Sequence, residues 1–131
     1  MTPLDNAAAC PCGTGRSYVG CCGRYHSGAR RPPTAVALMR SRYTAFALGL
    51  RDYLSATWHP TTRPETLLLD AETTWTGLDI TATTHGQAWE DEGTVTFAAA
   101  WSSPEGSGVL RERSRFLVED GRWFYLDGVT G

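Results

Sequence analysis

The amino-acid sequence predicts an α+β protein in which a small metal-binding knuckle precedes helices and then an antiparallel sheet. Three observations support this class. All four cysteines fall within residues 10–22, apolar residues recur at helical spacing over residues 35–50, and apolar residues alternate with polar ones from residue 78 onward. A period near 3.6 indicates a helix and a period of 2 indicates a strand, so the helical part comes before the sheet.

The composition describes one ordinary globular domain. The chain has 131 residues, of which 41% are hydrophobic and 20% charged, and this excludes disordered and fibrous classes. No apolar run approaches the length of about 20 residues that spans a bilayer, and the N-terminus lacks the order of charges and apolar residues found in signal peptides. We therefore expect a cytoplasmic protein without membrane insertion.

The cysteines Cys10, Cys12, Cys21 and Cys22 are the predicted metal ligands. A reducing compartment disfavours disulfides, and a bridge between two adjacent cysteines would be strained. Iron–sulfur centres usually show longer or different spacings. Zn²⁺ accepts four sulfurs in a tetrahedron, and four protein ligands leave no position for a reacting water, so the expected cofactor is structural zinc. His26 follows Cys22 by four residues and is an alternative fourth ligand.

Charge is divided unevenly along the chain. Residues 1–33 contain four arginines and one acid, for a net charge of +3, whereas residues 34–131 contain eight arginines and thirteen acids, for −5. Two interpretations stay open. The arginines Arg16, Arg24, Arg30 and Arg31 either compensate the negative charge of four thiolates on one dication, or form a patch for a protein or nucleic-acid partner.

Residues 10–23 read Cys-Pro-Cys-Gly-Thr-Gly-Arg-Ser-Tyr-Val-Gly-Cys-Cys-Gly, and His26 follows. This run resembles the SEC-C zinc motif at the C-terminus of the SecA translocation ATPase, where it contacts partner proteins. Thr14 and Arg16 replace the usual serine and lysine. The later chain resembles the bacterial YchJ-like family, which has no assigned biochemical role, at Leu38–Tyr43, Tyr53–Leu54, Thr57–Trp58, Trp75 and Trp123–Gly128.

The resemblance implies two domains and assigns the metal role to the four cysteines. Residues 1–31 are expected to form a SEC-C-type zinc knuckle. Residues 34–131 are expected to form a cone-shaped domain like nuclear transport factor 2 or cystatin, in which N-terminal helices pack on a curved antiparallel sheet.

Independently of the family, Pro32-Pro33 ends the basic segment, which predicts that the knuckle is a separate small lobe. Thr34 can cap a helix that runs to about Leu48 and stops at Gly49. Its apolar stripe, which should pack on a sheet, contains Ala35, Met39, Tyr43, Phe46 and Leu50, with Arg42 at its edge. A second short helix is predicted over residues 51–58.

Strands dominate the rest of the chain. Residues 94–101 alternate with Val95, Phe97, Ala99 and Trp101 on one face, and Leu78, Ile80 and Ala82 alternate in the strand before. Asp120-Gly121 predicts a two-residue hairpin turn between residues 109–119 and 122–127. Counting back from this turn places Val118 opposite Trp123, Phe116 opposite Tyr125 and Ser114 opposite Asp127, with Glu112 next on that face.

Polar groups thus share the apolar face. Burying carboxylates is costly unless cations or donors meet them, and Arg42 is the natural counter-charge. Two interpretations stay open: a buried ion pair that ties helix to sheet, or a ligand pocket with Trp58, Trp75 or Trp101 in its walls. The candidate binding residues are Arg42, Tyr43, Glu112, Ser114, Tyr125 and Asp127.

The sequence predicts a zinc-binding protein that acts as an adaptor, docking through its basic knuckle with Tyr18 and Tyr25 as contact points. The alternative is a small-molecule-binding protein or enzyme that uses the cone pocket, with Glu112 and Asp127 as an acid–base pair. His59 and His85 are expected to be ordinary surface residues. Neither a substrate nor a partner is specified.

Overall fold

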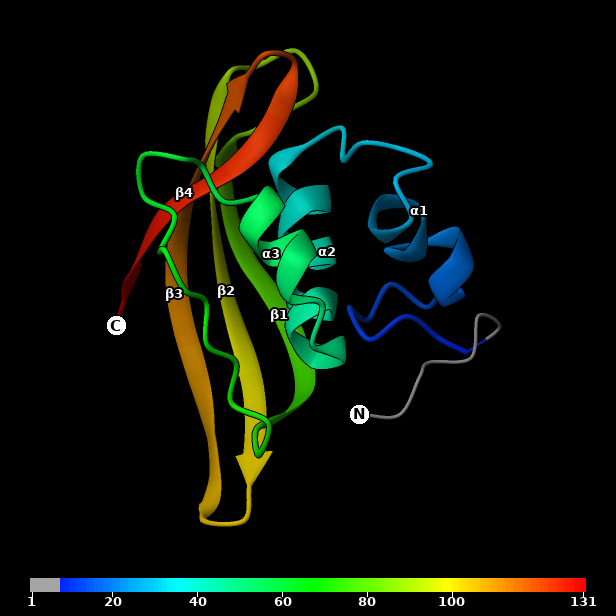
Figure 1. The fold of residues 1–131 in the computed structure, drawn as a ribbon, viewed down its shortest axis with the longest axis vertical. Coiled ribbons are helices and arrows are strands. Elements are labelled where there is room, and N and C mark those ends of the chain that lie inside the picture. Colours follow the sequence, from blue (N-terminus) through cyan, green and yellow to red (C-terminus); the bar gives the residue numbers. More distant parts are fainter. Residues whose placement is uncertain (1–7) are drawn as a thin grey trace.

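The structure is a computed structural model that describes residues 8–131 in three layers (Figure 1). An open sheet carries helices on one face, and the cysteine-rich segment, residues 8–31, lies on the far side of these helices; we call this segment the knuckle. Helices on one face of an antiparallel sheet confirm the predicted α+β class. The elements are η1 (Tyr18–Gly20), α1 (Gly23–His26), α2 (Ala35–Leu48), α3 (Arg51–Ala56), β1 (Thr74–His85), β2 (Glu92–Ser103), β3 (Gly106–Glu119) and β4 (Arg122–Thr130).

Helix α2 begins and ends where the sequence predicts. The Thr34 hydroxyl accepts a hydrogen bond of 3.0 Å from the backbone N–H of Ala37, which caps the first turn. Gly49 ends the helix with φ of 72°, a left-handed conformation that favours glycine. Helix α3 stops two residues earlier than predicted, at Ala56.

The four strands form an antiparallel meander in the order β1-β2-β3-β4. In β2 the residues Val95, Phe97 and Ala99 are buried on the helix-facing side, as their alternation predicts. Ala82 of β1 is exposed, contrary to the prediction, because the pairing of β1 with β2 shifts between Ile80 and Ala82. Such a shift changes which face the following residues occupy.

The β3–β4 hairpin turns at Asp120 and Gly121, which both have positive φ (54° and 78°), as the turn requires. The predicted pairs Val118–Trp123 and Phe116–Tyr125 are present. The predicted pairing of Ser114 with Asp127 is wrong.

A bulge at Leu126 explains this error. The register shifts so that Asp127 lies opposite Arg115, and Ser114 lies opposite Gly128. One extra residue in a strand moves every later side chain to the other face. Asp127 therefore leaves the helix-facing side and forms an ion pair with Arg115, with Nε–Oδ1 at 2.6 Å. Arg111, Arg113 and Arg115 are exposed, as predicted.

The knuckle is not separate in its packing. The four cysteines belong to the same buried cluster as Leu38 and Met39 of α2 and Phe116 of β3. Helix α2 is thus covered on both sides, by the sheet and by the knuckle (Figure 1). The predicted knuckle starts at residue 1, and residues 1–7 lie outside the described part of the chain. None of the described helices is both long and apolar enough to cross a bilayer.

Candidate metal centre and pocket

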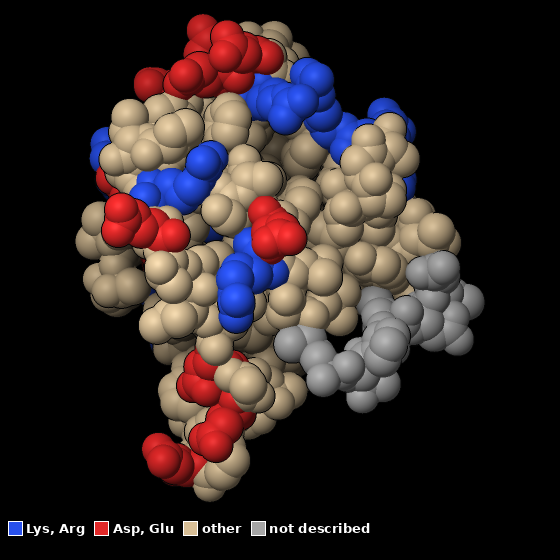
Figure 2. Space-filling model, viewed as in Figure 1, with Lys and Arg blue, Asp and Glu red and all other residues tan. Residues whose placement is uncertain are grey.

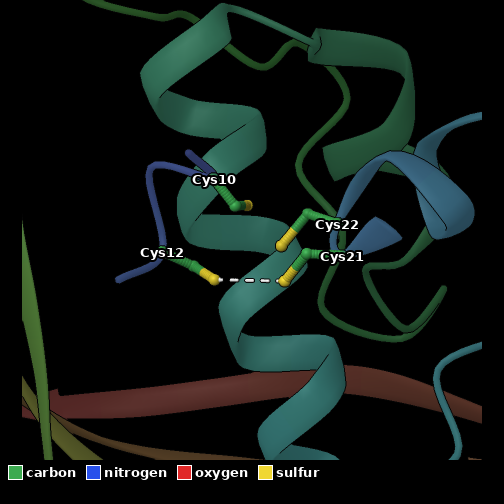
Figure 3. A group of neighbouring side chains, drawn as sticks. All are labelled: Cys10, Cys12, Cys21 and Cys22. Atoms are coloured by element: carbon green, nitrogen blue, oxygen red, sulfur yellow. Dashed lines mark hydrogen bonds between the residues drawn. The ribbon is translucent and has the colours of Figure 1, made fainter. Parts of the chain in front are cut away.

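Four cysteine sulfurs converge between the knuckle and α2 (Figure 3). Cys10 and Cys12 come from one arm of the loop, and Cys21 and Cys22 come from the turn between η1 and α1. All four sulfurs lie within 4.8 Å of one another. The four cysteines are only 0–6% exposed.

The arrangement fits a tetrahedral metal ion. Zn–S bonds are about 2.3 Å long, so four sulfurs around one zinc ion lie about 3.8 Å apart. The Sγ atoms of Cys12 and Cys21 are 3.6 Å apart, much further than a disulfide bond, and all four cysteines are free. The cluster therefore indicates metal binding.

The proton equilibria of the cluster also call for a cation. Hydrogen bonds with Cys12 and Cys22 lower the pKa of the Cys10 thiol. The bonds to Cys10 and Cys12, together with burial, raise the pKa of the Cys22 thiol. Four buried thiols this close cannot all ionise by themselves, whereas a dication would stabilise four thiolates.

Polar side chains surround the sulfurs. The Thr44 hydroxyl of α2 donates to Cys22 Sγ at 3.4 Å and lies 3.7 Å from Cys10 Sγ. The Thr14 hydroxyl lies 3.2 Å from Cys21 Sγ. Such contacts hold metal ligands in position.

Two arginines bind the backbone of the ligand residues. Arg40 Nη1 donates to the Cys12 carbonyl at 2.7 Å, and Arg24 Nε donates to the Cys21 carbonyl at 3.1 Å. Both bring positive charge next to the cluster. Of the two, only Arg24 belongs to the basic segment for which a compensating role was considered, and Arg40 comes from α2.

His26 is not among the converging groups. Its Nδ1 lies 2.7 Å from the Tyr18 hydroxyl, and its Nε2 lies 2.8 Å from the Ser41 carbonyl. Both ring nitrogens are therefore used, and burial lowers the pKa of the imidazole. The structure assembles four sulfurs, and His26 instead ties the knuckle to α2.

On its other side α2 forms one wall of a cavity of about 240 Å³. The cavity brings together five of the six candidate binding residues: Arg42, Tyr43, Glu112, Ser114 and Tyr125. Trp58 and Trp75 also contribute to its walls, whereas Trp101 packs over Gly108 on the neighbouring strand. Asp127 is on the opposite face, so it cannot act with Glu112 as an acid–base pair.

Arg42 is 4% exposed and is stacked between aromatic rings. Its guanidinium carbon lies 4.6 Å from the ring centre of Tyr125 and 5.1 Å from that of Trp58. Nη1 donates to the Leu54 carbonyl at 2.8 Å and to the Thr57 hydroxyl at 2.6 Å. Burial lowers the pKa of Arg42 to about 10, so the side chain is charged at neutral pH.

Glu112 supplies the opposite charge. Its Oε2 accepts hydrogen bonds from Ser114 Oγ at 2.5 Å and from the Tyr125 hydroxyl at 3.4 Å. Gly128, the strand partner of Ser114, lies beside the carboxylate, and a Cβ at that position would overlap it. Within residues 8–131, no nitrogen of Arg42 comes within 4.0 Å of a Glu112 oxygen. The predicted buried ion pair is thus absent as a direct contact, although both charges line one cavity.

The family model for the middle, nuclear-transport-factor-2-like domain of YchJ matches residues 34–128. The chain belongs to the YchJ-like family. A UPF0225 protein of Streptomyces coelicolor is 54% identical over 119 residues, which are 91% of this chain and 93% of that protein. A UPF0225 protein of Deinococcus radiodurans is 50% identical over 92% of this chain and 88% of its own length.

Two solved structures of SEC-C motif containing proteins are similar to this chain over nearly its whole length. The solution structure of a SEC-C motif containing protein from Rhodopseudomonas palustris has a TM-score of 0.81 and 31% identity, and the match covers 95% of this chain and 99% of that one. The crystal structure of a SEC-C motif containing protein from Psychrobacter arcticus has a TM-score of 0.77 and 29% identity, over 96% of this chain and 84% of that one. The fold is therefore the expected combination of a SEC-C-type knuckle and a cone-shaped domain.

The burial of His59 in this YchJ-like chain was not predicted from the sequence. His59, expected on the surface, is 7% exposed. Its Nε2 contacts Glu119, and its Nδ1 lies 2.7 Å from the Thr61 hydroxyl. No local pattern signals this position, because Glu119 lies on the far hairpin. His85, by contrast, is exposed as predicted.

Proposed function

We propose that this chain is a small-molecule-binding protein in which a structural zinc ion fixes the helix that forms one wall of the binding pocket. One observation carries the proposal: α2 contacts the cysteine cluster through Thr44 and lines the cavity through Arg42 and Tyr43. Concave, mostly apolar pockets with a few converging polar groups are the usual form of ligand sites. Four buried sulfurs are a typical ligand set for zinc. Because they fill its tetrahedral coordination and leave no position for a reacting water, the role of the zinc ion is structural.

Metal analysis of the purified protein tests the zinc assignment. We expect about one zinc ion per chain in the purified protein. The Cys22→Ser variant should lose this zinc, and the His26→Ala variant should retain it. Iron in place of zinc, or full zinc retention by the Cys22→Ser variant, would contradict this part of the proposal. The free thiols suit a reducing compartment, so we place the protein in the cytoplasm.

A thermal-shift screen of a metabolite library tests the pocket. We expect stabilising compounds for the zinc-loaded protein, because a ligand that binds the native state raises its stability. Their effect should be lost in Tyr43→Ala and kept in Arg51→Ala, which changes an exposed residue away from the cavity. Hits that act equally on both variants would mean that they bind elsewhere.

The second candidate function is docking through the knuckle, and one observation favours it. Arg16, Arg24 and Arg40 line a groove between the knuckle and α2. On the side shown in Figure 2, basic side chains gather over the segment that joins the knuckle to α2, and acidic ones gather at the ends of the sheet. Tyr18 is less suited to this role, since its hydroxyl already binds His26. A partner rich in acidic groups is the natural complement.

Co-purification from cell extract tests the docking candidate. A partner that is retained by the zinc-loaded chain, lost with Arg16→Ala and released steeply with salt would support it. Equal retention by the wild type and by Arg16→Ala would count against the groove. Protein and RNA partners are distinguished by nuclease treatment of the extract.

A further inference from the structure

We propose that the cone pocket binds a small planar molecule whose polar group is neutral and presents an acceptor beside a donor, as a primary amide or a lactam does. This inference rests on the proposed ligand-binding function and names its ligand class. It follows from two opposite charges that share the cavity without touching each other.

Arg42 has guanidinium N–H donors that no protein group within residues 8–131 accepts. Among the described residues, the hydrogen bonds of the Arg42 guanidinium all come from Nη1. A guanidinium carries five N–H donors, so Nε and Nη2 have no protein acceptor. Arg42 lines the cavity, and neither of these two nitrogens is fully buried, so a ligand oxygen or nitrogen in the cavity can accept hydrogen bonds from them.

Glu112 has one carboxylate oxygen that accepts no hydrogen bond from the described residues. Both recorded bonds of the Glu112 carboxylate go to Oε2, from Ser114 and Tyr125, and Oε1 has no partner within residues 8–131. Gly128 leaves the space that this carboxylate occupies. Its position is therefore set by two donors and by the absence of a side chain at Gly128, as in a preorganised site.

The charges decide against an ionic ligand. Arg42 and Glu112 together give the cavity no net charge, so a carboxylate ligand would be attracted by one and repelled by the other, and so would an ammonium ligand. Bringing an additional uncompensated charge into such a cavity is unfavourable. An amide instead accepts from Arg42 through its oxygen and donates to Glu112 through its N–H.

The lining and the volume of the cavity restrict the shape of the remaining part of the ligand. Tyr43, Phe46, Trp58 and Trp75 line the cavity with aromatic surface, and Tyr43 and Phe46 each meet Trp75 edge to face. The volume of about 240 Å³ is below the range of roughly 300–1,000 Å³ that holds drug-sized molecules. A single ring or a fused pair of small rings suits this space. The Trp58 indole Nε1 is the one buried side-chain nitrogen in the described part that lacks a partner.

Four probes with one ring and different polar groups test the class: benzamide, benzoate, benzamidine and acetophenone. Titrations of the zinc-loaded full chain are followed by the indole ¹⁵N–¹H signals of Trp58 and Trp75, assigned from Trp58→Phe and Trp75→Phe. We expect benzamide to bind at least ten-fold more tightly than the other three. Equal or tighter binding of benzoate or benzamidine would overturn the ligand class while leaving the pocket in place.

Variants separate the ligand class from the pocket. Glu112→Gln removes the charge but keeps an acceptor, so benzoate should gain at least ten-fold relative to benzamide. Gly128→Ala displaces the carboxylate, so benzamide should lose its advantage while the remaining spectrum stays native. Glu105→Gln, in the exposed turn between β2 and β3 and away from the cavity, should change nothing. If no probe shifts either indole signal at saturating concentration, the proposed ligand-binding function fails together with this inference.

Discussion

At the residue scale, Thr44 connects the metal centre to α2, because its hydroxyl contacts the sulfurs of Cys22 and Cys10. We expect Thr44→Val to weaken zinc binding by about 10–100-fold, the usual effect of removing a partner of a metal ligand. Competition with a chromophoric chelator measures this. Thr44→Ser should restore most of the affinity, and Thr66→Val, at an exposed site, serves as the matched control. Unchanged affinity in Thr44→Val would show that the hydroxyl does not orient the ligands.

A second residue-scale prediction concerns alkaline pH. Burial raises the pKa of Tyr53 to about 12, from an ordinary value near 10. Below pH 10 the phenol is neutral in both states, so its contribution is complete. As pH rises from 10 towards 12 the unfolded state ionises first, and the free energy of unfolding falls.

Urea unfolding at pH 9 and at pH 11 checks this expectation. Tyr53→Phe should show a smaller loss of stability between these two values than the wild type. It should also be less stable at pH 9 by about 1 kcal/mol, because the hydrogen bond to Ser41 is lost. Identical pH dependence in both proteins would rule out Tyr53 as the titrating group.

Side-chain roles were the hardest to predict from the sequence. The cysteine set was identifiable because four thiols in one short segment have few other uses. The choice between Cys22 and His26 was not, because it depends on hydrogen bonds to Tyr18 and Ser41 that form only in the folded chain. The burial of His59 was not predictable for the same reason, because its contact with Glu119 forms only in the folded chain.

At the element scale, the stability of α2 depends on the hydrogen bond that caps its first turn. The Thr34 side chain accepts from Ala37 N–H, so Thr34→Ala leaves an unsatisfied donor at the first turn. We expect the free energy of unfolding to fall by about 1 kcal/mol, measured by urea denaturation with zinc present. Thr34→Ser should lose little, since serine caps as well as threonine. A fall in Thr34→Ser as large as that in Thr34→Ala would point to lost packing in place of lost capping.

Alternation predicted the strands well because a strand that packs on helices buries one regular face. The bounds of α2 were predictable from its capping residues, although this helix is buried on two sides. It failed at Ala82 and Asp127, where register shifts break the alternation. A bulge inserts one residue without a distinctive sequence signal, so counting from the turn placed Asp127 on the wrong side. The cavity could be located from the sequence, but its exact polar composition could not.

At the scale of the whole molecule, knuckle and cone share a buried cluster, so zinc should stabilise more than its own loop. We expect chelation to speed hydrogen exchange in the knuckle and also across α2, because α2 loses one of its two packing surfaces. The central strands β2 and β3 should be least affected. Mass-spectrometric exchange with and without zinc measures this, and acceleration confined to residues 8–31 would contradict it.

The strand connections also bear on when the pocket can exist. Every strand of the sheet pairs with its neighbour in sequence, and contacts between near neighbours form readily during folding. The wall that carries Trp58 is different: Trp58 bridges to Tyr125 in parallel fashion, and Tyr125 N–H donates to the Thr57 carbonyl at 2.9 Å. On a chain emerging from the ribosome, all four cysteines appear well before Tyr125. Metal capture can thus begin before β4 has been made, whereas the pocket closes only once β4 has joined the sheet and paired with Trp58.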